Sequence, residues 1–455
     1  MVQPQPKFIT GSTMRHVVTM ALTGSLGMTF VFLVDAATLF WIGQLDDERM
    51  MAAVGYAGNI LFFTLSAGIG LMIATVVLVS RNLGAGRREE ARIQVTSALM
   101  TAFALQSAFA LVMWWFRDPI LRWAGASGEA LALGDTFLTI TLFSLPAMVT
   151  GMVAAGVLRA VGDAKRSLYV TLFSGVVAMV LDPLVIVWLG MGVPGAAWVW
   201  GAARLAMAVS GVYYVIGVHN LAARPDFRHA VRMFPAFTLL AFPLVLTQLS
   251  TPFGNYLLTS VMAGFGEASV AAWAVVGRVY FLTFSGLFAL AGAIGGIFGQ
   301  NIGAQKWDRV ESTFWSALYF CLGYTLVAWG VLLAASSFIS GAFGVPLAGQ
   351  QVVWAFAFTA GSLVFTGALF VANVAFYSLQ KPLYSTGFNW LRDGVVLWPL
   401  AVVLSGWFGA SGVVYAQGVA AIIVGTLAAF AASRFLRSLK GERASAMQNV
   451  QVDLI

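Results

Sequence analysis

The chain has 455 residues, of which 60% are hydrophobic and only 9% are charged. Soluble globular proteins carry about 25% charged residues, so this composition excludes a soluble domain and predicts an all-α polytopic membrane protein. The net charge of +7 would suit a nucleic-acid-binding protein, but most of the basic residues lie in short loops between apolar runs. We therefore expect no nucleic-acid partner.

Twelve apolar runs follow one another along the chain. Each is long enough to cross the hydrocarbon core of a bilayer, which takes about 20 helical residues. We expect transmembrane helices at 14–42, 51–80, 93–116, 131–158, 167–190, 195–217, 237–263, 267–297, 312–338, 351–379, 383–406 and 411–434.

The basic residues predict the orientation of these spans, because cytoplasmic loops of membrane proteins are rich in Lys and Arg. With the N-terminus in the cytoplasm, nineteen of the 25 basic residues fall in inner segments or at inner span ends. The outer segments hold Arg49, Arg117 and Arg122. We expect a multi-pass protein of the bacterial inner membrane with both termini in the cytoplasm.

The first span contains a carboxylic acid, Asp35, within an otherwise apolar stretch from Met28 to Trp41. An aspartate at the centre of a transmembrane helix costs about 2.5–3.5 kcal/mol on insertion scales. Such a group is usually protonated, paired with a cation or exposed to water. Each of these states would suit a protein that moves an ion or a solute across the membrane.

The chain also contains an internal repeat. Residues 81–87 match residues 300–306 at an offset of 219, and residues 192–197 match residues 409–414 at an offset of 217. Two matches at nearly one offset predict two pseudo-symmetric six-helix lobes. Since six is even, both lobes begin on the same side of the membrane, and substrate sites in such parallel repeats lie between the halves near mid-membrane.

This repeat sets the expected organisation of the chain. We expect an N-lobe over 1–217, a cytoplasmic linker over 218–236, a C-lobe over 237–434 and a loose cytoplasmic tail over 435–455. The linker carries several charged residues, and we expect part of it to form an amphipathic helix on the inner membrane surface.

Several motifs, taken in their order and spacing, resemble those of the multidrug and toxic compound extrusion (MATE) transporters. The motifs are Gly24-Ser25, Val34-Asp35, Ala52-Ala53-Val54-Gly55, and the segments 82–86, 158–165, 181–186 and 299–304. The resemblance implies two six-helix lobes around a central cavity. It also implies ion-driven export of amphiphilic, often cationic, drug-like compounds.

The chain departs from the family pattern at a few positions. Met20 stands where family members often carry a proline that is linked to bending of the first helix, whereas the second half keeps a proline at Pro243. Ala178 and Trp200 stand at or near positions where the family often has an asparagine and a threonine. The acids that sodium-coupled members carry in spans seven and ten are missing.

Three charged residues should lie in the outer half of the first lobe: Asp35, Asp182 and Arg204. The depth follows from the rise of about 1.5 Å per helical residue. Two buried acids near one arginine could leave one carboxyl able to load and release a proton, with Arg204 as a supporting ion-pair partner. The alternative is a static ion pair between Asp182 and Arg204 that only orders the lobe.

The coupling ion is therefore expected to be H⁺. Sodium is a less favoured alternative, because a hard cation needs about five or six oxygen ligands and Ala178 and Trp200 each remove an expected oxygen. A flippase for lipid-linked saccharides, of the same superfamily, is a further alternative.

In the second lobe, Arg278 and Asp393 should both reach mid-membrane, where they could form a structural pair or line a substrate cavity in which Asp393 binds a drug cation. Arg392 is expected to point elsewhere on its helix. Four uncharged polar residues, Asn59, Gln248, Asn255 and Asn373, also fall within spans. They are candidates for the wall of a substrate cavity, or they could be hydrogen-bond partners between helices.

No constellation of catalytic residues is visible in the sequence. The single cysteine, Cys321, lies in an apolar run, and the three histidines lack metal-ligand spacing. Gly84-Ala85-Gly86 lacks the Gly-Lys-Ser/Thr ending of a phosphate-binding loop. We therefore expect a monomeric transporter that is not an enzyme and has no cofactor, no bound metal and no nucleotide partner.

Overall fold

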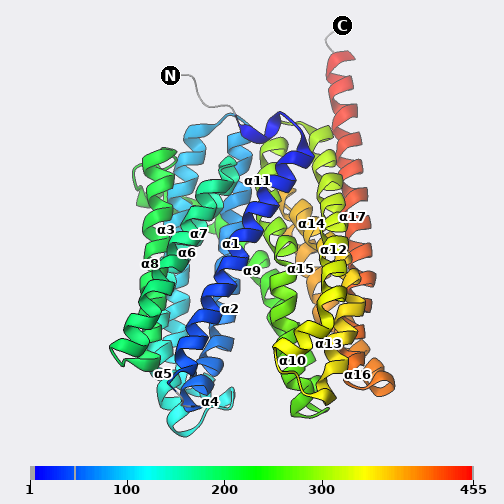
Figure 1. Cartoon of the computed structure of the whole chain (residues 1–455). Coiled ribbons are helices and arrows are strands. Elements are labelled where there is room, and N and C mark those ends of the chain that lie inside the picture. The colour runs from blue at the N-terminus through cyan, green and yellow to red at the C-terminus, as the bar shows by residue number, and fades with distance from the viewer. Residues whose placement is uncertain (1–5, 46–47, 453–455) are drawn as a thin grey trace. The chain divides into compact units, whose positions relative to one another are not determined.

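A computed structural model describes residues 6–45 and 48–452, and nearly all of these residues are helical. Within this part of the chain, eleven helices are long and apolar enough to cross a membrane, and one bent pair of helices supplies a twelfth span. The predicted all-α fold with twelve transmembrane helices is confirmed (Figure 1).

The first half of the chain supplies six spans. Its elements are the short 3₁₀ turn η1 (Lys7–Ile9), α1 (Thr13–Gly43), α2 (Glu48–Gly84), α3 (Arg88–Trp115), α4 (Arg117–Trp123), α5 (Gly128–Phe143), α6 (Leu145–Val161), α7 (Ala164–Asp182) with the π-helical turn η2 (Pro183–Trp188), and α8 (Gly192–Tyr213) with the π-helical turn η3 (Tyr214–Val218). Among these, α8 packs on both α6 and α7, and α3 packs on α6.

The second half repeats this order. Its elements are α9 (Phe227–Ala263), α10 (Glu267–Thr283), α11 (Ser285–Gly303), α12 (Trp307–Ala342), α13 (Leu347–Thr359), the 3₁₀ turn η4 (Ala360–Ser362), α14 (Leu363–Ser378), α15 (Pro382–Trp390) with the π-helical turn η5 (Leu391–Val396), α16 (Leu397–Phe408) and α17 (Ala410–Val452). Here α17 packs on both α14 and α16, and α11 packs on α14.

Span four is bent. The helices α5 and α6 meet at an angle of 47° around Ser144, and Pro146 stands in the first turn of α6. Proline has no N–H to donate and is well tolerated at a helix start. The bend exposes the carbonyl of Thr141, which accepts a hydrogen bond from the Ser144 hydroxyl at 2.6 Å.

The internal repeat is visible in matched contacts. The Ser167 hydroxyl donates to the carbonyl of Ala155 at 3.1 Å, and the Ser385 hydroxyl donates to the carbonyl of Asn373, also at 3.1 Å. Each pair spans 12 residues, and the second pair lies 218 residues after the first. The same interhelical contact is therefore built twice, at the offset that the sequence motifs predicted.

The helices pack into two compact units whose boundaries fall inside helices. One unit contains residues 6–25, 83–86 and 250–452, and the other contains 26–82 and 87–249. The first turns of α1 therefore pack with the second half of the chain: the Ser25 and Ser285 hydroxyls lie 2.7 Å apart. The lobe boundaries expected at 217 and 237 stay a prediction.

The structure departs from two expectations about the chain between and after the spans. Residues 227–236, expected in the linker, are the first turns of α9, where Asp226 accepts hydrogen bonds from the backbone N–H groups of Arg228 and His229; their place on the membrane surface stays a prediction. The expectation of a loose tail is wrong for its described residues, because α17 continues without a break to Val452. Lys440 on this extension pairs with Asp308 and Glu311 of α12.

Candidate functional site

Asp182 is the last residue of α7, where the α-helix passes into the π-helical turn η2. Pro183 follows it directly and has no N–H, so regular α-helical hydrogen bonding stops at this point. Asp182 is fully buried, and its neighbour Leu181 packs against an apolar cluster. The buried members of that cluster are Val34, Ala178, Val199 and Ala203.

The Asp182 carboxyl has one hydrogen-bond donor. The Thr38 hydroxyl of α1 donates to Oδ2 at 2.5 Å. The other oxygen, Oδ1, is buried and has no hydrogen-bond partner within the described part of the chain. Buried polar atoms are nearly always satisfied in native structures, so an orphaned carboxyl oxygen points to a group that binds something during the working cycle.

Asp35 lies on α1 one turn before Thr38, and its side chain is exposed on the surface of the helix bundle. Among the residues that the structure describes, Asp35 makes no hydrogen bond and no salt bridge, but the charges of Arg204 and Asp182 act on it. The three charged residues therefore lie within one unit and near enough for their charges to act on Asp35, while their role in proton coupling stays a prediction. The two acids differ in environment, since Asp182 is enclosed by protein and Asp35 is not.

Arg204 is anchored elsewhere than expected. Its Nη1 donates to the Thr141 carbonyl at 2.9 Å and to the Ser144 hydroxyl at 2.7 Å, and its guanidinium lies 5.4 Å from the centre of the Trp200 ring. The bend between α5 and α6 therefore supplies both of these oxygen acceptors. No ion pair joins Arg204 to Asp182 in the described chain, so the static pair considered above does not form.

The second half of the chain also has buried charged residues, but these form an ion pair. Arg392 and Asp393 form a two-pronged ion pair, with Nε–Oδ1 and Nη2–Oδ2 distances of 2.7 and 2.9 Å. Both side chains are buried, and the Ser250 hydroxyl donates to Asp393 Oδ2 at 2.9 Å. Gly254 of α9 makes room for the acid, since a Cβ there would lie 2.9 Å from the Asp393 Cβ.

Two predictions about this group are wrong. Arg278 lies exposed on α10 and has no salt bridge within the described residues, so the expected Arg278–Asp393 pair does not form. Arg392 does not point away from Asp393. The pair lies in the π-helical turn η5, where the wider i→i+5 bonding changes the directions of neighbouring side chains, and the long arginine side chain reaches the adjacent carboxylate.

The uncharged polar candidates lie in different surroundings. Asn373 is buried, and its Oδ1 accepts a hydrogen bond from the Asn389 side chain of α15 at 3.0 Å. Gln248 is half-buried and Asn255 is exposed. The side chain of Asn59 lies outside the described part of the structure. Asn373 is therefore an interhelical hydrogen-bond partner, whereas a place for Gln248 and Asn255 in a cavity wall stays a prediction.

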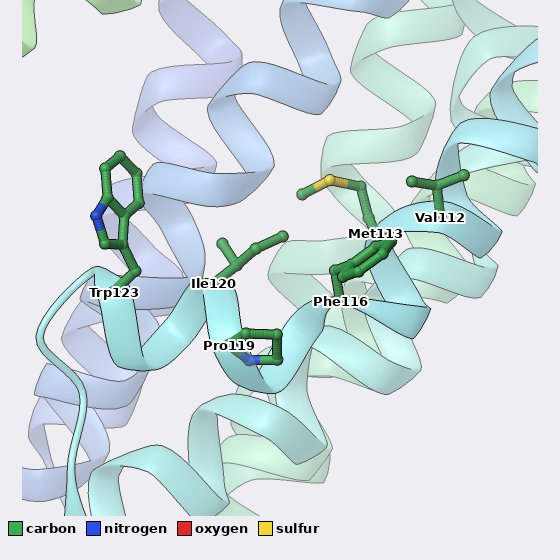
Figure 2. Close-up of a pocket in the computed structure, with 6 residues that line it drawn as sticks. All are labelled: Val112, Met113, Phe116, Pro119, Ile120 and Trp123. Atoms are coloured by element: carbon green, nitrogen blue, oxygen red, sulfur yellow. The ribbon is translucent and has the colours of Figure 1, made fainter.

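A shallow apolar pocket of about 290 Å³ lies where α3 turns into α4. Figure 2 shows its six lining residues, which come from the end of α3 and from α4. They are Val112, Met113, Phe116, Pro119, Ile120 and Trp123. None of the predicted site residues lines this pocket, and no charged side chain does, so it has no part in the charge cluster.

Sequence reasoning missed the hydrogen-bond partners of the charged groups. Thr38 follows Asp35 by three residues, a spacing that places both on neighbouring helix positions, and this signal could have identified it. Ser144 precedes the Leu145-Pro146 step that bends span four. Within the described residues, no three His, Cys, Asp or Glu side chains are arranged to hold a metal ion.

Comparisons with a family model and with known proteins agree with this architecture. The family model MatE matches the chain twice, over residues 25–184 and 243–403. The chain is 24% identical to an FAD transporter of Shewanella oneidensis, over 95% of this chain and 97% of that protein. It is 24% identical to a probable multidrug resistance protein, YpnP, of Bacillus subtilis, over 89% of this chain and 92% of that protein.

Solved structures show the same fold. The crystal structure of the MATE transporter VcmN of Vibrio cholerae superposes with a TM-score of 0.87 at 22% identity, covering 94% of this chain and 97% of that one. The two family-model matches begin 218 residues apart, which is the offset of the repeated serine contact. Two MatE repeats, twelve spans and two six-helix lobes thus agree, and the chain belongs to the MatE family of membrane transporters.

Proposed function

We propose that this protein is a secondary antiporter that exports amphiphilic, cationic compounds in exchange for protons. Asp35 and Asp182 are the proton-coupling residues, and Arg204 supports them. The observation that carries the proposal is the Asp182 carboxyl, which is fully buried with a single donor, Thr38, and one orphaned oxygen.

The choice of ion follows from what surrounds Asp182. A buried carboxylate requires a cation or a proton to balance its charge, and Arg204 donates to Thr141 and Ser144 and forms no ion pair with Asp182 in the described chain. A proton on Oδ1 completes the group without any further ligand. Sodium would need about five or six oxygens, and Ala178 instead belongs to an apolar cluster beside this site.

Asp35 is the residue that first takes up a proton in this cycle. It is exposed one helical turn from Thr38, so a proton can reach it from water and pass toward Asp182. Protonation removes negative charge that would otherwise hold a cationic substrate, and the lobes then change access. The excess of Lys and Arg in the predicted inner segments supports an inner-membrane protein with both termini in the cytoplasm, acting as a monomer.

The test is transport of ethidium in proteoliposomes with pH and sodium gradients imposed separately. We expect the pH gradient to drive uptake, and we expect Asp35→Asn and Asp182→Asn each to reduce it at least tenfold. Asp118→Asn is the matched control, because this exposed acid of α4 pairs with Arg122 and is no part of the charge cluster. Full proton-driven transport by both asparagine variants would reject the coupling role.

One observation favours a second candidate substrate. The relative that covers 95% of this chain is named as an FAD transporter, and flavin dinucleotides are anionic. Arg278 is an exposed basic residue within a span and could contact a phosphate. The same proteoliposomes loaded with FAD separate the two candidates: FAD transport that Arg278→Gln abolishes, without ethidium transport, would replace the cationic substrate by an anionic one.

A further inference from the structure

The segment that joins the two halves is held in place by hydrogen bonds to α3. After η3, residues 219–226 run without helix, and Arg88 of α3 donates to the His219 carbonyl at 2.6 Å. Arg92 donates to the Ala222 carbonyl at 2.9 Å. The backbone N–H of Ala223 donates to the Thr96 hydroxyl at 2.9 Å, and this hydroxyl donates to the Ala223 carbonyl at 3.1 Å. The first turns of α9 therefore begin at a fixed place beside α3.

These first turns carry cations that no acid balances. Arg224, Arg228 and Arg232 recur every fourth residue, so the two that lie within α9 share one face. All three are exposed, and none forms a salt bridge with any described residue. Lys165, in the turn between α6 and α7, is also exposed. An uncompensated row of three guanidinium groups is a site for an external anion.

The acids of the same segments are already engaged. The four acidic side chains of residues 87–92, 163–166 and 219–232 are Glu89, Glu90, Asp163 and Asp226. Glu89 pairs with Arg92 and Glu90 with Arg87, and Asp163 pairs with Arg166 and His219. Asp226 accepts from backbone N–H groups at the start of α9. None is paired with the three arginines.

An exposed apolar stripe lies next to the arginine face. Phe227, Val231 and Phe234 are 74%, 53% and 42% exposed, and their i, i+4, i+7 spacing puts them on one side of α9. Each of the first two directly precedes an arginine of the basic face. A helix with a cationic face beside an apolar face is typical of a segment at a membrane surface.

The second half of the chain provides an internal comparison. The equivalent position after its last span, 218 residues after His219, is Arg437, which lies 3.9 Å from Glu311 of α12. Lys440 contacts Asp308 at 2.7 Å and Glu311 at 2.9 Å. His219 is itself paired with Asp163, so the equivalent positions of both halves have acidic partners, whereas Arg224, Arg228 and Arg232 have none among the described residues.

We propose that Arg224, Arg228 and Arg232, together with the neighbouring Phe227, Val231 and Phe234, form a binding surface for anionic phospholipid. The guanidinium groups bind the headgroup phosphate, and the apolar stripe contacts the upper acyl chains. This surface is separate from the Asp35–Asp182 cluster, and it holds the junction between the two halves of the chain on the membrane.

The experiment uses the purified full-length protein in detergent, titrated with dioctanoyl phosphatidylglycerol or dioctanoyl phosphatidylcholine and followed by native mass spectrometry. A basic residue near an anionic surface contributes about fivefold to binding. The triple variant Arg224→Gln, Arg228→Gln, Arg232→Gln should therefore lose on the order of 100-fold in affinity for phosphatidylglycerol. The wild-type protein should prefer phosphatidylglycerol over phosphatidylcholine.

The matched control is the double variant Arg437→Gln, Lys440→Gln, which removes two cations that have acidic partners and should keep wild-type affinity. If the triple variant fails to fold, Arg232→Gln alone should lose about fivefold. Unchanged phosphatidylglycerol binding by the arginine variants would overturn the proposal. So would displacement of the lipid by an equal concentration of inorganic phosphate, because the surface would then bind the bare anion rather than a lipid.

Discussion

Replacing Asp393 by Asn should cause a large loss of stability, because it breaks a buried ion pair on one side only. Asn cannot balance the charge of Arg392, whose side chain is as enclosed as that of Asp393. Removing one partner of a buried pair costs about 3–5 kcal/mol. The folding equilibrium should therefore fall by roughly two to four orders of magnitude, since about 1.4 kcal/mol corresponds to a factor of ten.

The double variant Arg392→Met, Asp393→Leu should recover most of this loss. Replacing both members of a buried pair by apolar residues of similar volume is often neutral, and the loss of the hydrogen bond from Ser250 to Asp393 costs about 1 kcal/mol. Unfolding by SDS in mixed micelles, followed by the fluorescence of the 15 tryptophans, measures both variants. Arg278→Met, at an exposed cation without an ion pair, is the control and should change stability by about 0.5 kcal/mol or less.

The reasoning would be refuted if the single Asp393→Asn variant were as stable as the double variant, or if Arg278→Met were as damaging as Asp393→Asn. The second outcome would restore the Arg278–Asp393 pair that the sequence suggested.

Two further predictions concern the first half. Thr38→Val keeps the shape of the side chain but removes the one donor to Asp182 that the described residues supply. The pH profile of ethidium transport should move by about one unit or more, whereas an unmoved profile would show that the bond has no part in coupling. At the loop between α6 and α7, burial raises the pKa of Asp163, but hydrogen bonds from Arg166 and His219 outweigh it and hold the pKa below its usual range. The ionised acid is thus the stabilised form, so its contribution to stability is present above the unfolded-state pKa and is lost as pH falls through the lower folded-state value. The difference in melting temperature between the wild-type protein and Asp163→Asn should therefore be largest near pH 7 and vanish in acid, and a difference that grew toward low pH would contradict this sign.

The spans, the repeat and the charge cluster of the first half could be predicted from the sequence. Hydrophobic length alone identifies a transmembrane helix, and a motif repeated at one offset identifies the duplication. An isolated acid such as Asp35 stands out because intramembrane charges are rare. These properties depend on local composition, which the sequence displays directly.

The partners of the charged residues could not be predicted in the same way. Arg204 donates to the Thr141 carbonyl and the Ser144 hydroxyl at the bend of span four, and Arg392 pairs with Asp393 within a π-helical turn. A regular 3.6-residue periodicity contains neither feature. The extent of α17 also escaped prediction, and the partners of Lys440 on its extension, Asp308 and Glu311, lie far away in the sequence.

The division of α1 and α9 between the two compact units has a consequence for dissecting the protein. A cut in the non-helical run 219–226 separates the two sequence repeats, yet neither fragment would contain a complete unit. The amino-terminal fragment would lack residues 227–249 of its own unit, and the carboxy-terminal fragment would lack residues 6–25 and 83–86. Each fragment therefore carries residues that the other needs to complete its unit. A functional transporter should be recovered only when both fragments are synthesised in the same cell.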